Sequence, residues 1–318
     1  MRAFRMEAYR SVAEVPDNFG PSVVTIGNFD GVHAGHREIL RRVAAIARDR
    51  ALVPVVLTFD PHPARVLAPD RAPKLITTIS QRLRRTESQG IEAALLLPFS
   101  LALARLSPEE FARTVLAETL HARVVIVGDD FRFGHRQAGD LATLRTLGEQ
   151  LGFEVESAGT ILHRGARSSS TAIRKLVEAG RVSRACRMLG EPFALEGQVV
   201  PGRGIGHKQT VPTLNLAPEN ELLPKTGVYV TRTRDLESDR QWRSVTNVGY
   251  RPTFDGHDLT IETFLLDPLT GNTPNRIEVG FLHFIRDEKK FETPELLRAQ
   301  ILKDVAFANR LHARLSPH

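Results

Sequence analysis

The 318-residue sequence predicts a doubly wound α/β domain followed by a smaller antiparallel β-domain. Up to about residue 160, short apolar strands alternate with amphipathic helices, and strands of this kind are typical of a parallel sheet covered on both faces. After Gly190, short strand-like runs are separated by Gly, Pro and Asp without helices between them, which favours a small barrel or sandwich. A chain of this length also suits two domains.

Alternating strands and helices make up the first half. The predicted strands cover residues 22–27, 53–59, 93–99, 124–128 and 153–157, and the predicted helices cover 38–50, 80–89 and 141–151. A further helix begins at Ser107, where a serine cap, a proline at the first helical position and Glu110 three residues later form a capping box.

Strands without intervening helices make up the second half. They are predicted at 195–200, 227–234, 243–249, 260–266 and 276–282, and a helix capped by Thr293 follows over 294–310. We place the domain boundary between residues 188 and 189, so that the domains cover 1–188 and 189–318.

Composition excludes several classes of protein. With 42% hydrophobic and 25% charged residues, the chain has the balance of a globular protein and not of a disordered one. No apolar run approaches the roughly 20 residues of a membrane-spanning helix, and the N-terminus lacks the apolar core of a secretory signal. The one cysteine excludes an internal disulfide and a cysteine-built metal site. We therefore expect a cytoplasmic protein without a membrane partner.

Charge is divided unevenly along the chain. Residues 1–190 hold 27 basic and 20 acidic residues, a net charge of +7, whereas the remainder has a net charge of −1. The first half is therefore the one expected to bind an anion, and a nucleotide suits this surplus as well as a nucleic acid does. The adjacent pairs Arg84-Arg85 and Lys289-Lys290 are interpreted as solvated surface charge.

The strongest local motif is GNFDGVHAGH at 27–36, a glycine-bearing loop between a strand and a helix. Backbone N–H groups at such a helix start can bind a phosphate, and Gly35 leaves room for the imidazoles of His33 and His36 beside it. A pair of histidines can stabilise charge that develops on phosphorus. Two alternatives remain: an ordinary turn with surface histidines, or a metal site, for which the loop offers no third ligand.

Three further motifs in the first half suit a nucleotide site. Ser170 and Thr171 open a helix, and Arg174 follows one turn later, so hydroxyls and a guanidinium can bind an anion; a plain serine-capped helix is the alternative. Asp130, Phe131 and Phe133 follow the strand at 124–128, where open α/β sheets bind their ligands, although the two phenylalanines can equally anchor the loop in the core. His62, between two prolines, follows the strand at 53–59.

The second half holds a glycine-rich loop and two polar strands. Gly202 and Gly206 belong to a loop that can approach phosphates closely, and it lacks the GK[ST] of a P-loop. Thr213 and Asn215 follow with oxygen ligands that suit Mg²⁺. Glu262 lies between apolar neighbours on a predicted strand, where it is either a partly buried general base or a solvent-facing residue.

Together these motifs resemble the bacterial bifunctional riboflavin kinase/FMN adenylyltransferases, also called FAD synthetases. The resemblance is collinear over nearly the whole chain and rests on GNFDGVHAGH, FDPHP, GDDFRFG, SSSTAIR, GQVV, PTLNL, GVYV, TNVGYRPTF, IETFLLD and KFETPELLRAQILKD. It implies a Rossmann-like nucleotidyltransferase domain followed by a riboflavin kinase β-barrel with a C-terminal helix. The barrel domain would phosphorylate riboflavin to FMN, and the first domain would adenylylate FMN to FAD with release of pyrophosphate.

The resemblance also implies a role for each candidate residue. Both steps would use ATP and Mg²⁺, with riboflavin and FMN as the flavin substrates and no nucleic acid. His33 and His36 would act on the ATP phosphates, and Glu262 would accept a proton from the ribityl hydroxyl of riboflavin. The implied ATP-binding residues are Gly27, Asn28, Phe29, Gly35, Ser170, Thr171, Arg174, Gly202 and Gly206; the flavin-binding residues are His62, Asp130 and Phe131; the metal-binding residues are Thr213 and Asn215.

Departures from the family pattern leave a second interpretation open. His207, Thr210 and Leu214 stand where the kinase loop usually has Arg, Gly and Ala, so the alternative is an FAD synthetase with a weak or inactive kinase. A more distant alternative is a class I aminoacyl-tRNA synthetase, which also has an HxGH motif. The near-neutral second half and the lack of a helical anticodon-type domain argue against it.

Overall fold

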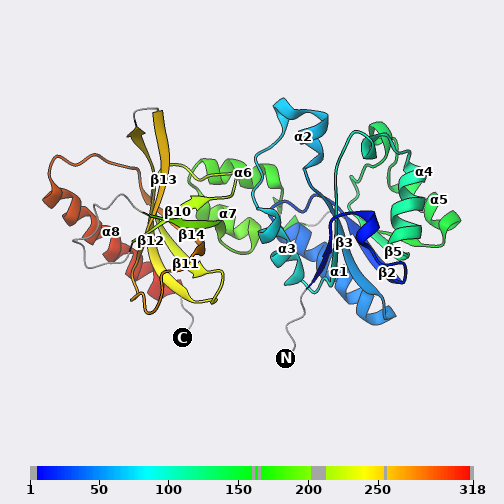
Figure 1. Cartoon of the computed structure of the whole chain (residues 1–318), viewed down its shortest axis with the longest axis horizontal. Coiled ribbons are helices and arrows are strands. Elements are labelled where there is room, and N and C mark those ends of the chain that lie inside the picture. The colour runs from blue at the N-terminus through cyan, green and yellow to red at the C-terminus, as the bar shows by residue number, and fades with distance from the viewer. Residues whose placement is uncertain (1–5, 160–161, 164–165, 202–212, 254–255, 316–318) are drawn as a thin grey trace. The chain divides into compact units, whose positions relative to one another are not determined.

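The computed structural model describes residues 6–159, 162–163, 166–201, 213–253 and 256–315, which form two compact units. The first unit comprises Met1–Lys74 and Ile79–Ser169, and the second comprises Leu75–Thr78 and Ser170–His318 (Figure 1). The helices Ser170–Glu178 (α6) and Val182–Leu189 (α7) thus group with the second unit. The predicted boundary between residues 188 and 189 stays a prediction.

A six-stranded sheet forms the centre of the first unit, and all of its strands are parallel. Their order is β1-β4-β3-β2-β5-β6, with bounds Glu7–Tyr9 (β1), Ser22–Ile26 (β2), Val53–Phe59 (β3), Ala93–Leu97 (β4), Ala122–Val127 (β5) and Glu154–Ser157 (β6). The α-helices are Ala34–Arg50 (α1), Pro63–Leu67 (α2), Ile79–Glu87 (α3), Pro108–Phe111 (α4) and Leu141–Leu151 (α5), and α4 continues as a π-helix over Ala112–Thr119. The short strands Leu162–His163 (β7) and Ala166–Arg167 (β8) pair with each other.

Two hydrophobic cores cover the two faces of this sheet. Alternate strand residues point to opposite faces, so Val24 packs with α4, the π-helix and α5, whereas its neighbour Val23 packs with α1 and α3. This arrangement confirms the doubly wound α/β fold and the continuous apolar strands that predicted it.

Local signals in the sequence explain where the helices begin. The capping box is present as predicted: Ser107 Oγ accepts from the N–H of Glu110 at 3.1 Å, and the Glu110 carboxylate accepts from the N–H of Ser107 at 2.7 Å. Helix α1 begins four residues before the predicted Glu38, because the ring of His33 serves as its N-cap. The edge strand β1 was not predicted, since three residues with both faces partly exposed give no apolar pattern.

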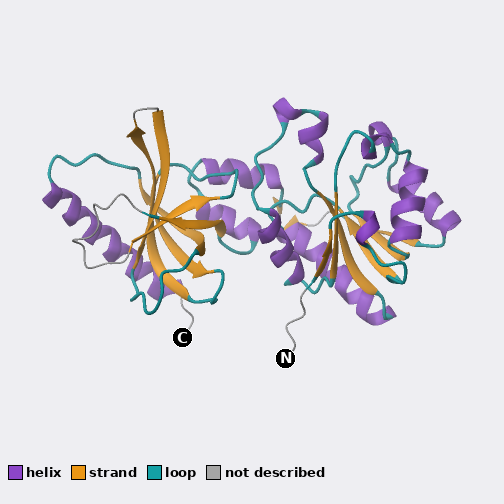
Figure 2. Cartoon of the chain, in the orientation of Figure 1, coloured by secondary structure: helices purple, strands orange, loops and turns teal. Residues whose placement is uncertain are grey.

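The second unit is a closed antiparallel barrel, which decides between the predicted barrel and sandwich (Figure 2). Its strand order is β10-β13-β12-β11-β14-β9, with bounds Phe193–Val200 (β9), Thr213–Pro218 (β10), Gly227–Asp235 (β11), Gln241–Thr253 (β12), Gly256–Leu265 (β13) and Arg276–Arg286 (β14). Its helices are Ser170–Glu178 (α6), Val182–Leu189 (α7) and Pro294–Leu315 (α8). The hydroxyl of Thr293 caps α8 as predicted, with the N–H of Leu296 at 3.4 Å.

The barrel interior combines apolar side chains with a ladder of buried hydroxyls. The hydroxyl oxygen of Thr231 lies 2.8 Å from the hydroxyl oxygens of both Ser244 and Thr246. The hydroxyl oxygen of Thr246 lies 3.0 Å from that of Thr263. Each hydroxyl therefore has a partner without water, which removes most of the cost of burying it. The helices α6 and α7 bury Ile173, Val177, Val182, Ala185 and Leu189 against the same interior core.

Candidate active sites

The loop between β2 and α1 presents two stacked imidazoles. His33 caps α1, and its Nδ1 accepts a hydrogen bond from the backbone N–H of His36 at 3.3 Å. The two rings lie 3.6 Å apart between centroids, with 14° between their planes. Because Nδ1 of His33 accepts this bond, the neutral ring carries its proton on Nε2, which is left as a donor. The structure thus brings the two predicted histidines together.

Glycines make room for the rings at this helix start. A Cβ on Gly35 would lie 3.3 Å from Cε1 of His33, and a Cβ on Gly27 would lie 3.2 Å from Cε2 of Phe29. Phe29 in turn contacts His36 edge-on, at 5.1 Å between ring centroids. A side chain at either glycine would therefore require the neighbouring aromatic ring to shift by a few tenths of an ångström.

Unsatisfied polar atoms mark the same place. Oδ1 of Asn28 and Nδ1 of His36 are buried without a hydrogen-bond partner among the described residues. Buried polar atoms nearly always have a partner, so two orphans beside one helix start are typical of a ligand site. The first turn of α1 contains no acidic residue to compete with an anion for its N–H groups.

Burial keeps both histidines uncharged at neutral pH. It lowers the pKa of His33 to about 4, although the nearby Asp30 carboxylate acts in the opposite direction. Burial also lowers the pKa of His36 well below its usual value, and the neighbouring His33 and the Arg82 guanidinium lower it further. Two neutral rings can stack closely, so the pair offers hydrogen bonds to a phosphate and not two positive charges.

The other predicted residues of the first unit follow β3 and β5, the two neighbours of β2 in the sheet. The carboxyl ends of parallel strands share one edge, so these loops open on the same side as the histidines. His62 caps α2, with its Nδ1 accepting from the N–H of Ala64 at 3.1 Å. Asp130 is exposed.

The phenylalanine pair after β5 has two environments. Phe133 is buried in the core and contacts Phe111 at 6.0 Å between centroids, so it anchors the loop. Phe131 is half-buried and stacks on Phe133 at 5.4 Å with 15° between planes. The anchoring alternative therefore holds for Phe133, and the flavin role of Phe131 stays a prediction.

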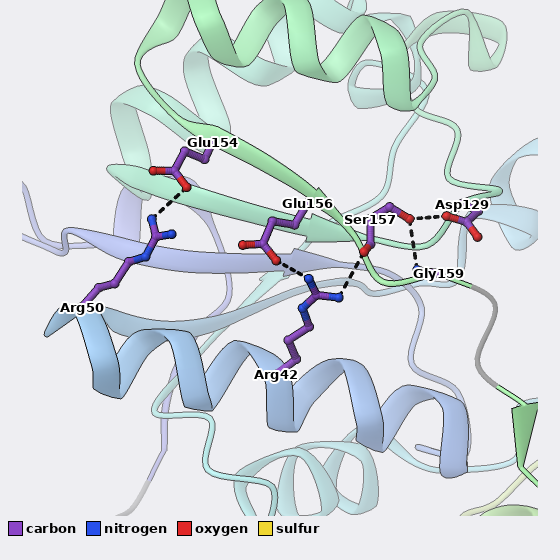
Figure 3. Close-up of polar contacts among 7 residues, drawn as sticks. All are labelled: Arg42, Arg50, Asp129, Glu154, Glu156, Ser157 and Gly159. Atoms are coloured by element: carbon purple, nitrogen blue, oxygen red, sulfur yellow. Dashed lines mark hydrogen bonds and ion pairs between the residues drawn. The ribbon is translucent and has the colours of Figure 1, made fainter.

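Polar contacts tie α1 to the edge strand β6 (Figure 3). Arg42 binds the Glu156 carboxylate at 2.5 Å and donates to the Ser157 carbonyl at 3.2 Å. The Ser157 hydroxyl bonds to the Asp129 carboxylate and accepts from the N–H of Gly159 at 3.0 Å. These contacts hold the end of β6 against the turn after β5, next to the predicted Asp130.

Ser170, Thr171 and Arg174 lie on α6, in the second unit. Ser170 is its first residue, as predicted. The helix buries Ile173 and Val177 in the barrel core, while Thr171 is exposed and Arg174 half-buried. Their action on the same ATP as His33 stays a prediction, because the histidines belong to the first unit.

The register of the barrel brings the three kinase candidates together. Asn215 of β10 lies directly opposite Glu262 of β13, and Thr213 lies opposite Phe264 two residues along. All three candidates are half-buried, while the alternate residues Leu214 and Thr263 point into the barrel core. Residues directly opposite on neighbouring strands share a face, with Cβ atoms about 5 Å apart. The face therefore carries a carboxylate beside an amide and a hydroxyl.

Three kinase-loop positions differ from the family pattern, and the structure describes one of them. Leu214 is 3% exposed in the barrel core, so it does not crowd the face that carries Thr213 and Asn215. Gly202 and Gly206 of the predicted ATP loop, and the departures His207 and Thr210, lie outside the described residues.

The structure adds two residues that sequence reasoning missed. Asn247 of β12 lies opposite Glu262 on its other side, so the glutamate has an asparagine on each neighbouring strand. Only the pairing of strands that are distant in the sequence reveals the position of Asn247.

The second residue is Arg82, which lies buried near the histidine pair. The prediction that Arg85 is solvated is wrong, since Arg85 is only 9% exposed. Strand and helix periodicity gave no signal for these buried arginines.

Two classes of site are missing from the part of the chain that the structure describes. No cluster of three or more His, Cys, Asp or Glu side chains is placed to hold a metal ion in the described ranges. None of the described helices has the length and apolar character needed to cross a membrane.

Comparison with known proteins finds the same family in both halves. A family model described as FAD synthetase matches residues 15–172, and one described as riboflavin kinase matches residues 189–312. Curated relatives named bifunctional riboflavin kinase/FMN adenylyltransferase include that of Escherichia coli K12, 35% identical over 93% of this chain and 94% of its own. Another, from Pseudomonas fluorescens, is 34% identical over 97% of this chain and 98% of its own.

A solved structure agrees over the whole chain. It is titled a macrolide-efflux protein from Streptococcus pneumoniae and superimposes with a TM-score of 0.84 at 28% identity, covering 96% of this chain and 98% of its own. The curated relatives bear a different name, and their identity extends over both units. On this evidence the chain belongs to the bifunctional riboflavin kinase/FMN adenylyltransferase family.

Proposed function

We propose that this enzyme makes FAD from riboflavin in two ATP-dependent steps, with riboflavin phosphorylated by the barrel domain and FMN adenylylated by the first domain. The observation that carries the proposal is that each unit brings its own set of candidate residues together: the imidazole stack at the start of α1, and the Asn215–Glu262 pair on the barrel. The relatives with both activities in their name match both halves. We place the enzyme in the cytoplasm, where ATP is available for both steps.

Adenylyl transfer requires alignment more than it requires acid–base chemistry. An oxygen of the FMN phosphate attacks the α-phosphorus of ATP, a new P–O bond forms, and the bond to the bridging oxygen breaks to release pyrophosphate. The nucleophile is already an anion, so no base has to remove a proton. His33 and His36 then act as hydrogen-bond donors to the phosphate oxygens, and the N-terminal end of α1 adds to the stabilisation.

The kinase step needs a base because its nucleophile is an alcohol. The terminal ribityl hydroxyl of riboflavin attacks the γ-phosphorus of ATP, its proton passes to the Glu262 carboxylate, and ADP leaves. Thr213 and Asn215 offer the hard oxygen donors that Mg²⁺ prefers, on the same face as the glutamate. Bound there with ATP, Mg²⁺ would neutralise phosphate charge. Leu214 leaves this face clear, which favours an active kinase over the weakened one.

One assay tests the proposal. The purified protein is incubated with Mg²⁺ and ATP, once with riboflavin and once with FMN, and the flavins are separated by chromatography. We expect FAD to form from both substrates. When EDTA removes the metal, we expect no FMN or FAD from riboflavin and no FAD from FMN. If FAD forms from FMN but not from riboflavin, the result would support the weak-kinase alternative. If neither substrate gives a product, the result would contradict an enzymatic role.

A further inference from the structure

A buried ion pair lies beside the histidine stack of the first unit. Arg82 of α3 is 2% exposed and is the largest of the fully buried side chains in the described chain. Asp30, in the loop between β2 and α1, is also 2% exposed, and its Oδ1 lies 4.0 Å from Nη2 of Arg82. Removing two charges from water carries a large free-energy cost, so stability alone does not explain the pair.

The loop that carries Asp30 has an unfavourable backbone. Phe29 and Val32 have φ angles of 47° and 42°, a region that L-residues seldom adopt and β-branched residues least of all. Such residues persist only where surrounding contacts hold them, and both side chains here are buried. Arg37 adds a hydrogen bond from its Nε to the Val32 carbonyl at 3.1 Å. The next residue is His33, so the path of this loop sets the position of the first imidazole.

The same ion pair acts on the two imidazoles through its charges. The Asp30 carboxylate raises the pKa of His33 against the effect of burial, and the Arg82 guanidinium lowers the pKa of His36. Within the described part of the chain, the charged or titratable groups that shift the pKa values of this stack are Asp30, Arg82 and the histidines themselves. The effects have opposite signs, so the two charges can be distinguished experimentally.

We propose that Arg82 is a positioning residue for adenylyl transfer: through Asp30 it fixes the strained loop, and it thereby holds the His33–His36 stack ready for ATP. The inference rests on the proposed function of the first unit. The side chain of Arg82 is almost completely buried, so we assign it an indirect role through the loop and not a contact with ATP. A residue that merely filled the core would affect stability but would not need its charge or its partner.

A double-mutant cycle in the full chain tests the pair. The variants are D30N, R82M and D30N/R82M, and R48M is the control because Arg48 is exposed at the end of α1. We expect kcat for FMN to FAD to fall about 10- to 100-fold in each single variant, since small misplacements of catalytic groups cost this much. The double variant should fall no further, because either change already breaks the pair. R48M and the riboflavin kinase activity should be unaffected.

A charge-conserving variant and NMR complete the test. R82K should keep most of the adenylyl-transfer rate, and D30N carries the loss-of-activity test by itself if R82M does not fold. In histidine titrations, R82M should raise the pKa of His36 and D30N should lower that of His33. Rates within twofold of wild type, or single effects that multiply in the double variant, would overturn the inference. A wild-type protein that makes no FAD from FMN would overturn the proposed function instead.

Discussion

Glu262 shows how strand register turns an ordinary glutamate into a candidate base. The sequence places it between apolar neighbours, which leaves a solvent-facing residue as an alternative, and one strand alone cannot decide. The register supplies what the pattern lacks: asparagines directly opposite on both neighbouring strands and a threonine on the same face. Such long-range pairing cannot be read from a single sequence.

A substitution at Glu262 separates the two activities. E262Q keeps the size and polarity of the side chain and removes the proton acceptor, so we expect kcat for riboflavin to FMN to fall about 10²- to 10⁴-fold. FMN adenylylation should stay at the wild-type rate, because that nucleophile needs no base. Chromatography of flavins from the two separate assays measures both rates. Equal losses in both assays would show that Glu262 has only a structural role.

The low pKa of His33 predicts how stability responds to acid. The unfolded chain takes up a proton on this imidazole near pH 6.5, whereas the folded protein does so only near pH 4. The uncharged imidazole therefore makes its full contribution to stability above pH 6.5. This contribution, at most on the order of 3 kcal/mol, is lost as the pH falls from 6.5 to 4. H33N keeps an N-cap acceptor without titrating.

Calorimetry of wild type and H33N at pH 7, 5.5 and 4.5 measures this effect. We expect the transition temperature of the wild type to fall relative to that of H33N each time the pH is lowered. A constant difference between the two proteins across this range would contradict the predicted titration of His33.

At the scale of elements, prediction succeeded where local chemistry decides. The serine capping box before α4, the threonine cap of α8 and the apolar strands of the first unit are all where the sequence placed them. It failed where tertiary contacts decide. The edge strand β1 exists because it pairs with β4, and α3 buries arginines on a face that its charges suggested was solvated.

One buried carboxylate of the C-terminal helix pairs with an arginine of the barrel. Asp304 of α8 is 4% exposed and accepts hydrogen bonds from Nε and Nη2 of Arg286 on β14, the latter at 2.8 Å. Gln300 adds a third donor at 2.8 Å. D304N leaves the guanidinium without its counter-charge, so we expect a loss of about 3–5 kcal/mol in the stability of the second unit.

Urea unfolding followed by the fluorescence of Trp242, in the same unit, measures this loss. Q300A is the matched control on the same helix, and we expect it to cost about 1 kcal/mol, because it removes a single hydrogen bond and leaves the ion pair. An effect of D304N no larger than that of Q300A would show that the ion pair does not hold α8.

At the scale of the whole molecule, sequence order and structural grouping differ at one point. Leu75–Thr78 lies within the first half of the sequence and belongs to the second unit. Its backbone bonds to that unit through the Leu75 carbonyl, which accepts from the N–H of Leu222 at 3.2 Å, and the Ile76 carbonyl, which accepts from Asn220 at 3.3 Å. Composition shifts mark where a domain begins, but they cannot reveal a four-residue segment that joins another core.

Ile76 provides the test of this grouping. Its side chain is completely buried in the barrel core, whereas Ile79, three residues later, packs against the core of the first unit. An Ile-to-Ala change in a core costs about 2–5 kcal/mol. We therefore expect I76A to lower the temperature at which riboflavin phosphorylation is lost and to leave that of FMN adenylylation unchanged, while I79A should do the opposite. Residual activities after brief heating measure both midpoints, and an I76A protein that loses adenylylation first would contradict the assignment of this segment.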